Sequence, residues 1–345
     1  MEPSLIVSGS SDKTIRVWRV PQKLYNFERL GNLRPVLEVL KLLSPEEVVG
    51  IARVNKQFYE ASFHSEVQKP VFKQTKVLRG HTGGIWSVAM SKSRNMLASG
   101  SVDNTVRMWS LASGEVTQVL KGHSKGVSCV AISGRGEFLV SGSADNNLKL
   151  WSLSTLKQTL DLEGHSARVN SVAICSNDEI LISGSDDNTL RVWSLKTGEQ
   201  ILTFEGHSSR VNSVAVSKNN EFVVSGSWDC TVRVWSLNTG EQVRVLQGHG
   251  DYVSSVAISS SNELTVSGSW DKTIRVWSLA SGETIQVLKK HTGPVLCLSL
   301  SSDDNYLVSG SGIGDPSVRV WEIAEGQQIQ ELQRHYDSIW SVCLS

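Results

Sequence analysis

A histidine, a serine and an aspartate recur together in this chain, and these residue types could perform nucleophilic chemistry. One such set is His165, Ser183 and Asp187, and Trp193 follows it closely. A histidine oriented by an aspartate can activate a serine hydroxyl for acyl transfer. However, the set returns in nearly every stretch of the chain, whereas a catalytic centre is built once. We therefore interpret the set as architecture, and we expect no catalytic residue and no enzyme.

The histidines and tryptophans of these sets reveal an internal repeat. Histidines 81, 123, 165, 207, 249 and 291 are each 42 residues apart, and His335 follows after 44. The tryptophans at 109, 151, 193, 235 and 277 keep the same step of 42 residues. Apolar and polar residues alternate in short segments, and Gly, Ser, Asn and Asp separate the segments, which is typical of strands and turns. Four short strands per repeat indicate a propeller blade, which cannot bury its faces alone.

The repeated pattern G/K-H…S-G-S-x-D…W resembles the WD40 family, and the resemblance covers about 290 of the 345 residues. It implies an all-β fold, a seven-bladed propeller. In that family the four polar side chains of each repeat form hydrogen bonds in series. The resemblance therefore gives Trp193, Ser183, His165 and Asp187 the role of a structural tetrad. Such a buried polar set stiffens a blade only when every member has a partner.

The two ends of the chain complement each other within one repeat. Residues 5–18 contain the second half of a unit, and residues 335–345 contain the first half and stop after one strand. We predict that they form one shared blade, with an innermost strand from the C-terminus, two strands from the N-terminus and an outermost strand at 76–79. Sharing a blade in this way leaves no exposed central edge. The predicted propeller domain comprises residues 1–18 and 76–345.

Residues 19–75 interrupt the shared repeat, and their composition differs from the rest of the chain. Four of the seven prolines and no tryptophan fall in this segment, and its net charge is +3. The sequence Ser44-Pro45-Glu46-Glu47 is typical of a helix start with proline at the first helical position. Apolar residues recur at helical spacing on both sides of this start. We therefore predict a small α-helical insertion.

The core of this insertion, residues 33–69, resembles an F-box. The resemblance rests on an apolar helix that ends in L-S-P, an acidic start and the run V-V-x-I-A-x-V-x-K-x-F-Y, without a gap from Leu40 to Ser62. It implies binding of a Skp-type adaptor and membership of a cullin ubiquitin ligase. The residues that it assigns to adaptor binding are Leu33, Pro35, Leu40, Leu43, Pro45, Val48, Val54 and Phe58. The alternative is an unrelated helical insertion.

The loops that carry the repeated His and Asp should meet on one face of the propeller, and the insertion should leave from the opposite face. Bulky residues at the variable positions of these loops cluster on three consecutive repeats: Arg168, Asp186, Arg210, Trp228, Tyr252 and Trp270. A second pair, Trp86 and Trp340, shares one position in neighbouring repeats. Arg, Tyr and Trp carry much of the binding energy of protein interfaces. We predict that a protein or peptide binds here; the alternative is solvated arginines beside tryptophans that pack on neighbouring blades.

Two arginines in this cluster could favour an acidic or a phosphorylated segment. Phosphate-binding members of the resembled family carry several arginines that face the central channel. The corresponding positions here contain no basic residue: Trp86, Ser128, Asn170, Asn212, Ser254, Leu296 and Trp340. We therefore do not expect a phosphate-specific site.

The composition excludes several classes of function. Lys and Arg number 34, as do Asp and Glu, so the chain lacks the charge excess that binds nucleic acid or membrane surfaces. No apolar run is long enough for a membrane helix, and the N-terminus lacks the features of a signal peptide. The five cysteines occur singly, which indicates no disulfide framework, metal site or cofactor. We expect a cytoplasmic or nuclear protein.

Two functions are consistent with the sequence. The first is a substrate receptor in which residues 33–69 dock a ubiquitin-ligase adaptor and the propeller face holds a substrate. The second is a WD40 interaction scaffold with an unrelated insertion and no role in ubiquitination. Neither requires catalysis by this chain.

Overall fold

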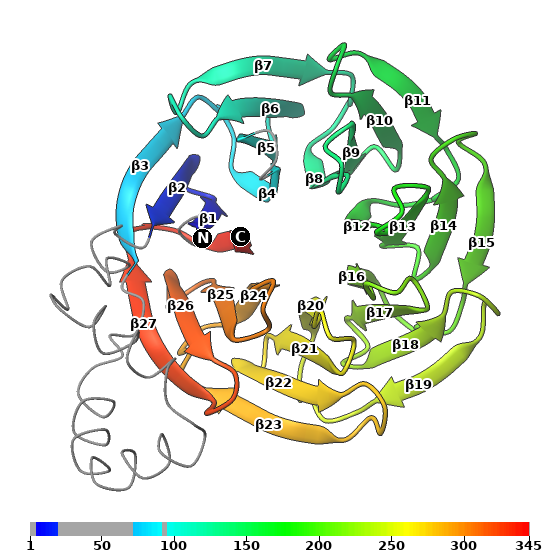
Figure 1. Cartoon of the computed structure of the whole chain (residues 1–345), viewed down its shortest axis with the longest axis vertical. Helices are drawn as coiled ribbons and strands as arrows, with labels where there is room; N and C mark the ends of the chain where they lie inside the picture. Colours follow the sequence, from blue (N-terminus) through cyan, green and yellow to red (C-terminus); the bar gives the residue numbers. More distant parts are fainter. Residues whose placement is uncertain (1–4, 20–71, 92–94, 345) are drawn as a thin grey trace, which may run out of the picture. The chain divides into compact units, whose positions relative to one another are not determined.

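The computed structural model describes residues 5–19, 72–91 and 95–344. Within these ranges, twenty-eight strands form seven antiparallel sheets of four strands each. The sheets stand around a common centre as the blades of a propeller (Figure 1), so the predicted all-β, seven-bladed fold is confirmed. The helical core predicted at 33–69 lies outside the described residues. No helix in the described ranges has the length and apolar character needed to cross a membrane.

Six blades each follow the chain from the innermost to the outermost strand. The first consists of β4 (Ile85–Ser91), β5 (Met96–Ser101), β6 (Thr105–Ser110) and β7 (Val116–Lys121). The second consists of β8 (Val127–Ile132), β9 (Phe138–Ser143), β10 (Leu148–Ser152) and β11 (Gln158–Leu162). The third consists of β12 (Val169–Ile174), β13 (Ile180–Ser185), β14 (Leu190–Ser194) and β15 (Gln200–Phe204).

The next three blades repeat this order. The fourth consists of β16 (Val211–Val216), β17 (Phe222–Ser227), β18 (Val232–Ser236) and β19 (Gln242–Leu246). The fifth consists of β20 (Val253–Ile258), β21 (Leu264–Ser269), β22 (Thr273–Ser278) and β23 (Thr284–Lys289). The sixth consists of β24 (Val295–Leu300), β25 (Tyr306–Ser311), β26 (Ser317–Glu322) and β27 (Gln327–Gln333).

The seventh blade is shared between the two ends of the chain, as the sequence predicts. Its order is β28 (Ile339–Leu344), β1 (Leu5–Ser10), β2 (Thr14–Arg19) and β3 (Lys73–Arg79). The antiparallel register of β1 and β28 pairs Ile6 with Leu344 and Gly9 with Ser341. In Figure 1, red β28 accordingly lies inside dark-blue β1. The outermost strand begins three residues before the predicted start at 76.

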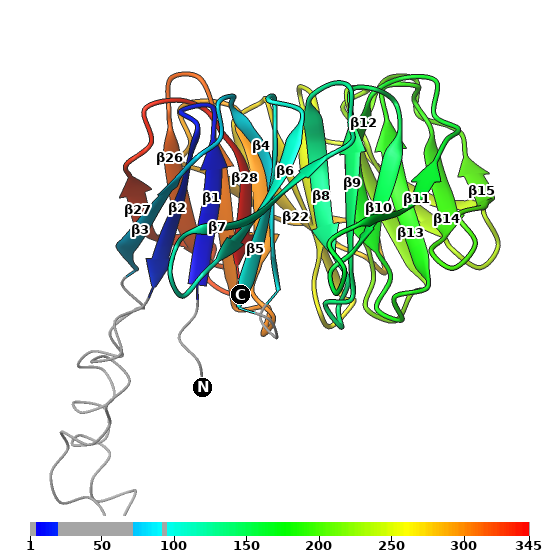
Figure 2. The ribbon, with the colours of Figure 1, turned by 90° about the horizontal axis from the view of Figure 1, so that it is seen from above.

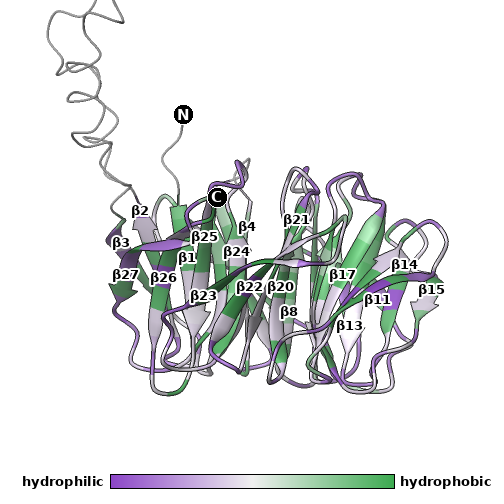
Figure 3. Cartoon of the chain, turned by 90° about the horizontal axis from the view of Figure 1, so that it is seen from below, coloured by the Kyte–Doolittle hydropathy of each residue, from purple (hydrophilic) through white to green (hydrophobic). Residues whose placement is uncertain are grey.

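The hydrophobic core lies between neighbouring blades. One cluster joins Val140 and Leu150 of the second blade to Leu181 and Trp193 of the third. Seen from the side, the strands run between two faces that consist of turns (Figure 2). Hydrophobic residues concentrate along the inner strands, whereas many connecting turns and outermost strands are hydrophilic (Figure 3). Each blade therefore depends on its neighbours for burial.

The glycine of the S-G-S sequence allows this close packing. A Cβ on Gly184 would lie 2.7 Å from the γ-methyl carbon of Val211, at the start of the next blade. No side chain fits into this space without displacing β16. The repeat therefore needs glycine here because the side chains of Val211 and Val214 fill the space, and not because of a special φ angle.

Hydrogen bonds between innermost strands also link the blades. The Oγ of Ser213 in β16 accepts a bond from the N–H of Val256 in β20, at 3.0 Å. Ser171 accepts in the same way from Val214 at 3.1 Å. On the opposite face, the Asp178 carboxylate accepts bonds from two backbone N–H groups of the second blade. These bonds hold the loops of successive blades in a fixed relation.

Candidate functional site

In six of the blades, the repeated set of polar residues forms a buried chain of hydrogen bonds. In the third blade, the indole Nε1–H of Trp193 donates to Ser183 Oγ at 2.8 Å. Ser183 Oγ lies 2.7 Å from His165 Nε2, and His165 Nδ1 lies 2.7 Å from Asp187 Oδ2. Because a carboxylate can only accept, Nδ1 carries the proton and the serine hydroxyl donates to Nε2. The four predicted tetrad residues are thus hydrogen-bonded in series.

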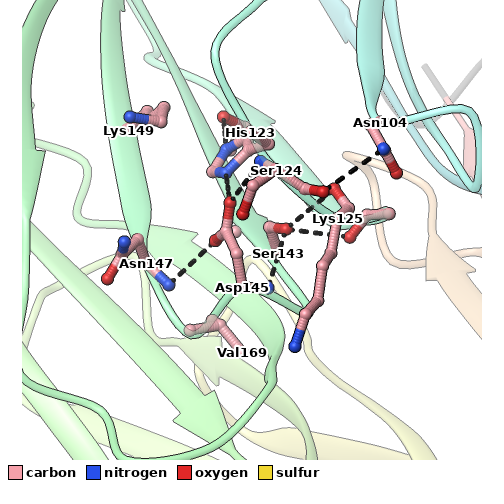
Figure 4. A network of polar contacts seen from close by, with 12 residues as sticks. Asn104, His123, Ser124, Lys125, Ser143, Asp145, Asn147, Lys149 and Val169 are labelled. Carbon is pink, nitrogen blue, oxygen red and sulfur yellow. Dashed lines mark hydrogen bonds and ion pairs between the residues drawn. The ribbon is translucent and has the colours of Figure 1, made fainter.

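The same arrangement holds the loop before the innermost strand of the second blade. His123 Nδ1 lies 2.9 Å from Asp145 Oδ2, and the N–H of Ser124 donates to the same oxygen at 2.9 Å (Figure 4). The other carboxylate oxygen accepts from the N–H of Asn147 at 3.1 Å. The aspartate thereby joins two loops on one face of the blade.

Burial disfavours the protonated form of most of the tetrad histidines. It lowers the pKa of five of them from the ordinary value of 6.5: His81, His123, His207, His291 and His335. Each partner aspartate opposes this change without cancelling it. The aspartates behave differently, because burial alone would raise their pKa. Hydrogen bonds to Thr105 and His81 outweigh burial and lower the pKa of Asp103 to about 2.

Because the tetrads are buried, a substrate cannot reach their serine hydroxyls as it reaches the serine of a catalytic triad. Ser183 has no exposed surface, and its Oγ already contacts both the indole and the imidazole. A substrate carbonyl cannot approach such a hydroxyl without displacing the core. The chemistry that this geometry supports is therefore loop positioning, which is a structural task.

Above the tetrads, seven side chains on the loop face are linked by ring contacts and electrostatic interactions, and we call them the Arg–aromatic belt. It extends over the first to the fifth blade. In order of contact, its members are Trp86, Arg168, Asp186, Arg210, Trp228, Tyr252 and Trp270. All seven were singled out by the sequence analysis, and the structure brings them together.

The first contact of the belt crosses a whole blade. The guanidinium of Arg168, before β12, lies 4.2 Å from the ring centre of Trp86 in β4. The Trp86 ring passes over the intervening second blade at Gly126, where a Cβ would lie only 2.7 Å from a ring carbon. Glycine at this position therefore leaves the space that the cation–π contact needs.

The centre of the belt is charged. Asp186 Oδ2 lies 3.7 Å from Arg210 Nη1, and Asp186 Oδ1 accepts a hydrogen bond from Asn170 Nδ2 at 2.7 Å. The Arg210 guanidinium lies 4.6 Å from the ring centre of Trp228. About half of the Arg210 side chain remains exposed, at 49%. Arg210 is thus held by a ring and a carboxylate while it faces solvent.

The far end of the belt is aromatic. Trp228 and Tyr252 are stacked, with 4.5 Å between ring centres and an angle of 9°. Tyr252 meets Trp270 edge to face at 5.9 Å and 62°. The backbone N–H of Trp228 donates to the carbonyl of Arg210, and the backbone N–H of Trp270 donates to the carbonyl of Tyr252. Each bond lies within one blade. These backbone bonds fix the loops that present the rings.

The family comparison agrees with this architecture. A family model described as "WD domain, G-beta repeat" matches residues 2–19, 72–110, 114–152, 155–194, 198–236, 240–278 and 282–322. The chain belongs to the WD40 repeat family. The matched ranges leave out residues 20–71, which contain the F-box-like core, so the family assignment concerns the propeller.

Curated WD40 relatives match over limited stretches. A "Ribosome biogenesis protein WDR12 homolog" of Oryza sativa subsp. japonica is 29% identical over 117 residues, 33% of this chain and 27% of that protein. A component of chromatin assembly factor 1 of Gallus gallus is 28% identical over 131 residues, 32% of this chain and 23% of that protein. A component of eukaryotic translation initiation factor 3 of Aspergillus niger is 53% identical over 36 residues, 10% of this chain and 11% of that protein.

Trp340 does not join the belt, although it occupies the same repeat position as Trp86. Its Nε1–H donates to Ser11 Oγ in the shared blade at 2.7 Å, and 38% of the residue is exposed. The two tryptophans therefore have different surroundings: Trp86 supports an arginine, and Trp340 faces solvent beside the closure of the ring.

Two exposed residues near Trp340 were not found by the sequence analysis. Tyr336 is 88% exposed and Ile313 is 82% exposed on the same loop face. Tyr336 follows its tetrad histidine directly, at a position where the other repeats have Thr, Ser or Gly. Ile313 lies in the turn that is two residues longer than its equivalents. The tyrosine in place of a small residue and the longer turn are the sequence signals that indicate these two residues.

The remaining predicted residues fall outside the described part of the chain. These are the F-box-like positions Leu33, Pro35, Leu40, Leu43, Pro45, Val48, Val54 and Phe58. Among residues 5–19, 72–91 and 95–344, no group of three or more His, Cys, Asp or Glu side chains is arranged to hold a metal ion. Burial raises the pKa of the Cys129 thiol to about 12, which is typical of a packed core cysteine.

Proposed function

We propose that this WD40 chain is a non-catalytic interaction scaffold that binds a protein or peptide segment on the face of the Arg–aromatic belt. The observation that carries the proposal is the belt itself, whose rings and arginines are partly exposed and held by neighbouring contacts. Rigid aromatic side chains bury a large area at low cost in conformational entropy. Such preorganised anchors are typical of protein-binding surfaces.

The exposed apolar residues of the sixth and shared blades extend this surface. Ile313, Tyr336 and Trp340 lie beyond the belt on the same loop face. Exposed large apolar side chains that gather on one face favour association with another protein. The loop face therefore offers exposed apolar side chains to a bound segment in addition to the belt.

A capture experiment tests the proposal. Proteins that bind the full chain would be quantified by mass spectrometry for the wild type, for a Trp228→Ala, Trp270→Ala double variant, and for Ile201→Ala. Ile201 is a matched control because it is apolar and 51% exposed but lies on the outermost strand β15. We expect the double variant to lose specific partners and the control to retain them. Equal capture by both variants would refute a role for the belt.

We also propose, from the sequence of residues 33–69 alone, that the chain docks a Skp-type adaptor and serves as a receptor of a ubiquitin ligase. The support is the ungapped F-box resemblance from Leu40 to Ser62. The relatives named above are factors of ribosome biogenesis, chromatin assembly and translation initiation, and these names suggest a scaffold in the cytoplasm or nucleus without ubiquitin chemistry. The two proposals differ only in the task of the insertion.

Co-expression with a Skp-type adaptor separates them. If residues 33–69 form an F-box, the adaptor co-purifies with the wild-type chain, and Leu40→Asp with Phe58→Ala abolishes this. The belt variant Trp228→Ala is the matched control and should co-purify normally. An adaptor that fails to co-purify with the wild type, or that still binds the Leu40/Phe58 variant, leaves only the scaffold function.

A further inference from the structure

The centre of the Arg–aromatic belt carries hydrogen-bond donors that lack acceptors. Within the described residues, the Arg210 side chain makes a cation–π contact and an ion pair at 3.7 Å but no hydrogen bond. A guanidinium has five N–H donors in a planar fork. Since half of this side chain is exposed, its free donors can reach a ligand.

Asn212, two residues after Arg210 in the chain, provides a second group. Its counterpart in the preceding blade, Asn170, donates to Asp186 Oδ1 at 2.7 Å and to the carbonyl of Val211 at 3.0 Å. In the blade of Asn212, the position of Asp186 is taken by Trp228, which offers an N–H and no acceptor. The partly exposed Asn212 amide accordingly has no hydrogen-bond partner in the described part of the chain.

The charge of the site is also unbalanced. Arg168 and Arg210 are close enough for their positive charges to interact, and Asp186 is the carboxylate between them. One oxygen of Asp186 also accepts a hydrogen bond from Asn170. Two guanidinium groups and one carboxylate leave a local charge of +1, surrounded by donors. This combination is complementary to a singly charged acceptor.

We propose that the belt recognises an acidic residue of the bound segment, whose carboxylate docks on Arg210 and accepts a further hydrogen bond from Asn212. The inference rests on the proposed binding of a protein segment to this face. Trp228 and Asp186 hold the guanidinium in place before binding, so little side-chain entropy is lost when the carboxylate arrives. The planar fork matches a carboxylate with two parallel hydrogen bonds.

Other ligand charges fit the site less well. A basic side chain would meet two arginines, and the ring of Trp228 is already stacked with Tyr252 and covered by Arg210. A phosphate carries nearly two negative charges, whereas the site offers a surplus of one. A glutamate or aspartate matches both the charge and the donors.

The proposal is tested with an oriented peptide library presented to the full chain. One central position is fixed as Glu, Gln, Lys or phosphoserine, and the other positions are randomised. We expect peptides with Glu to be enriched over those with Gln by about tenfold or more, the effect of hydrogen bonds to a charged group. Arg210→Gln should remove this preference. Arg244→Gln is the matched control, since Arg244 lies on β19 and donates to Ala280 and Ser281.

The outcomes distinguish this inference from the function on which it rests. If peptides bind in a manner that depends on Trp228 but Glu and Gln are recovered equally, only the acidic preference is wrong. Preference for Lys, or for phosphoserine that survives Arg210→Gln, also overturns it. If no recovered peptide depends on Trp228, the proposed binding face itself fails. Thermal unfolding of each variant confirms that the propeller remains folded.

Discussion

At the scale of single residues, the tetrads make the fold sensitive to acid. Each histidine is buried beside an aspartate, and the neutral ring fits a network in which Nε2 accepts from serine. Protonation of Nε2 would replace that acceptor by a donor in a buried site. Burial also lowers the pKa of His207 and His291, because it takes the charged ring out of water. The unfolded chain therefore binds protons more readily than the folded chain below pH 6.5.

The expected consequence is a loss of stability in two stages as the pH falls. A group whose pKa is lower in the folded state stabilises the fold above its unfolded pKa, and this contribution is lost as the pH falls through the folded value. The histidines should act first, from an ordinary value of 6.5 downward. The aspartates should follow between their ordinary value of 3.8 and about 2, as for Asp12 and Asp103. Thermal unfolding at a series of pH values measures both stages.

A constant unfolding temperature between about pH 7.5 and pH 5 would contradict this account. Phe substitution at one tetrad histidine offers a control, because removal of one titrating ring should reduce the slope of stability against pH. His81→Phe is suitable, since burial lowers the pKa of His81. The variant will be less stable overall, but the test concerns the pH slope and not the absolute stability.

At the scale of elements, the repeat made most of the belt predictable. Residues before the innermost strands and in the turns of S-G-S-x-D recur every 42 positions, so Arg210, Trp228 and Tyr252 could be placed on adjacent blades from spacing alone. The structure adds the order of their contacts. Trp228 and Tyr252 stack because the two loops meet at the junction of the fourth and fifth blades.

Other parts of the site depend on packing that spacing does not encode. The reach of Trp86 to Arg168 requires a small residue at Gly126 in a different repeat. The start of β3 at Lys73 was missed because its first three residues are exposed and give no alternation of burial. The positions that vary in every repeat do not predict Tyr336 and Ile313, because each is a departure from the pattern in a single repeat. The repeat thus predicts where each side chain lies on the blades, whereas the volumes of neighbouring side chains determine which of them touch.

At the scale of the whole propeller, closure depends on one short strand from the C-terminus. β28 pairs with β1, and its side chains Ile339, Val342 and Leu344 are all buried. The N–H of Leu344 also donates to Ser299 Oγ of the sixth blade, and Ser341 Oγ accepts from Val88 of the first. This strand therefore joins three blades at once.

Deletion of residues 335–345, which contain β28 and the loop before it, should consequently prevent stable closure of the ring. Burial of each of its three apolar side chains contributes about 2 kcal/mol, so the loss approaches the whole stability of a typical domain. We expect the deleted chain to lack the cooperative thermal transition of the full chain, as followed by circular dichroism. A synthetic peptide of residues 335–345 added in trans should restore the transition. A peptide with His335→Ala should restore it less well, because His335 bonds Ser8 and Asp12 across the shared blade. A deleted chain that unfolds at the same temperature as the full chain would show instead that the other blades close without this strand.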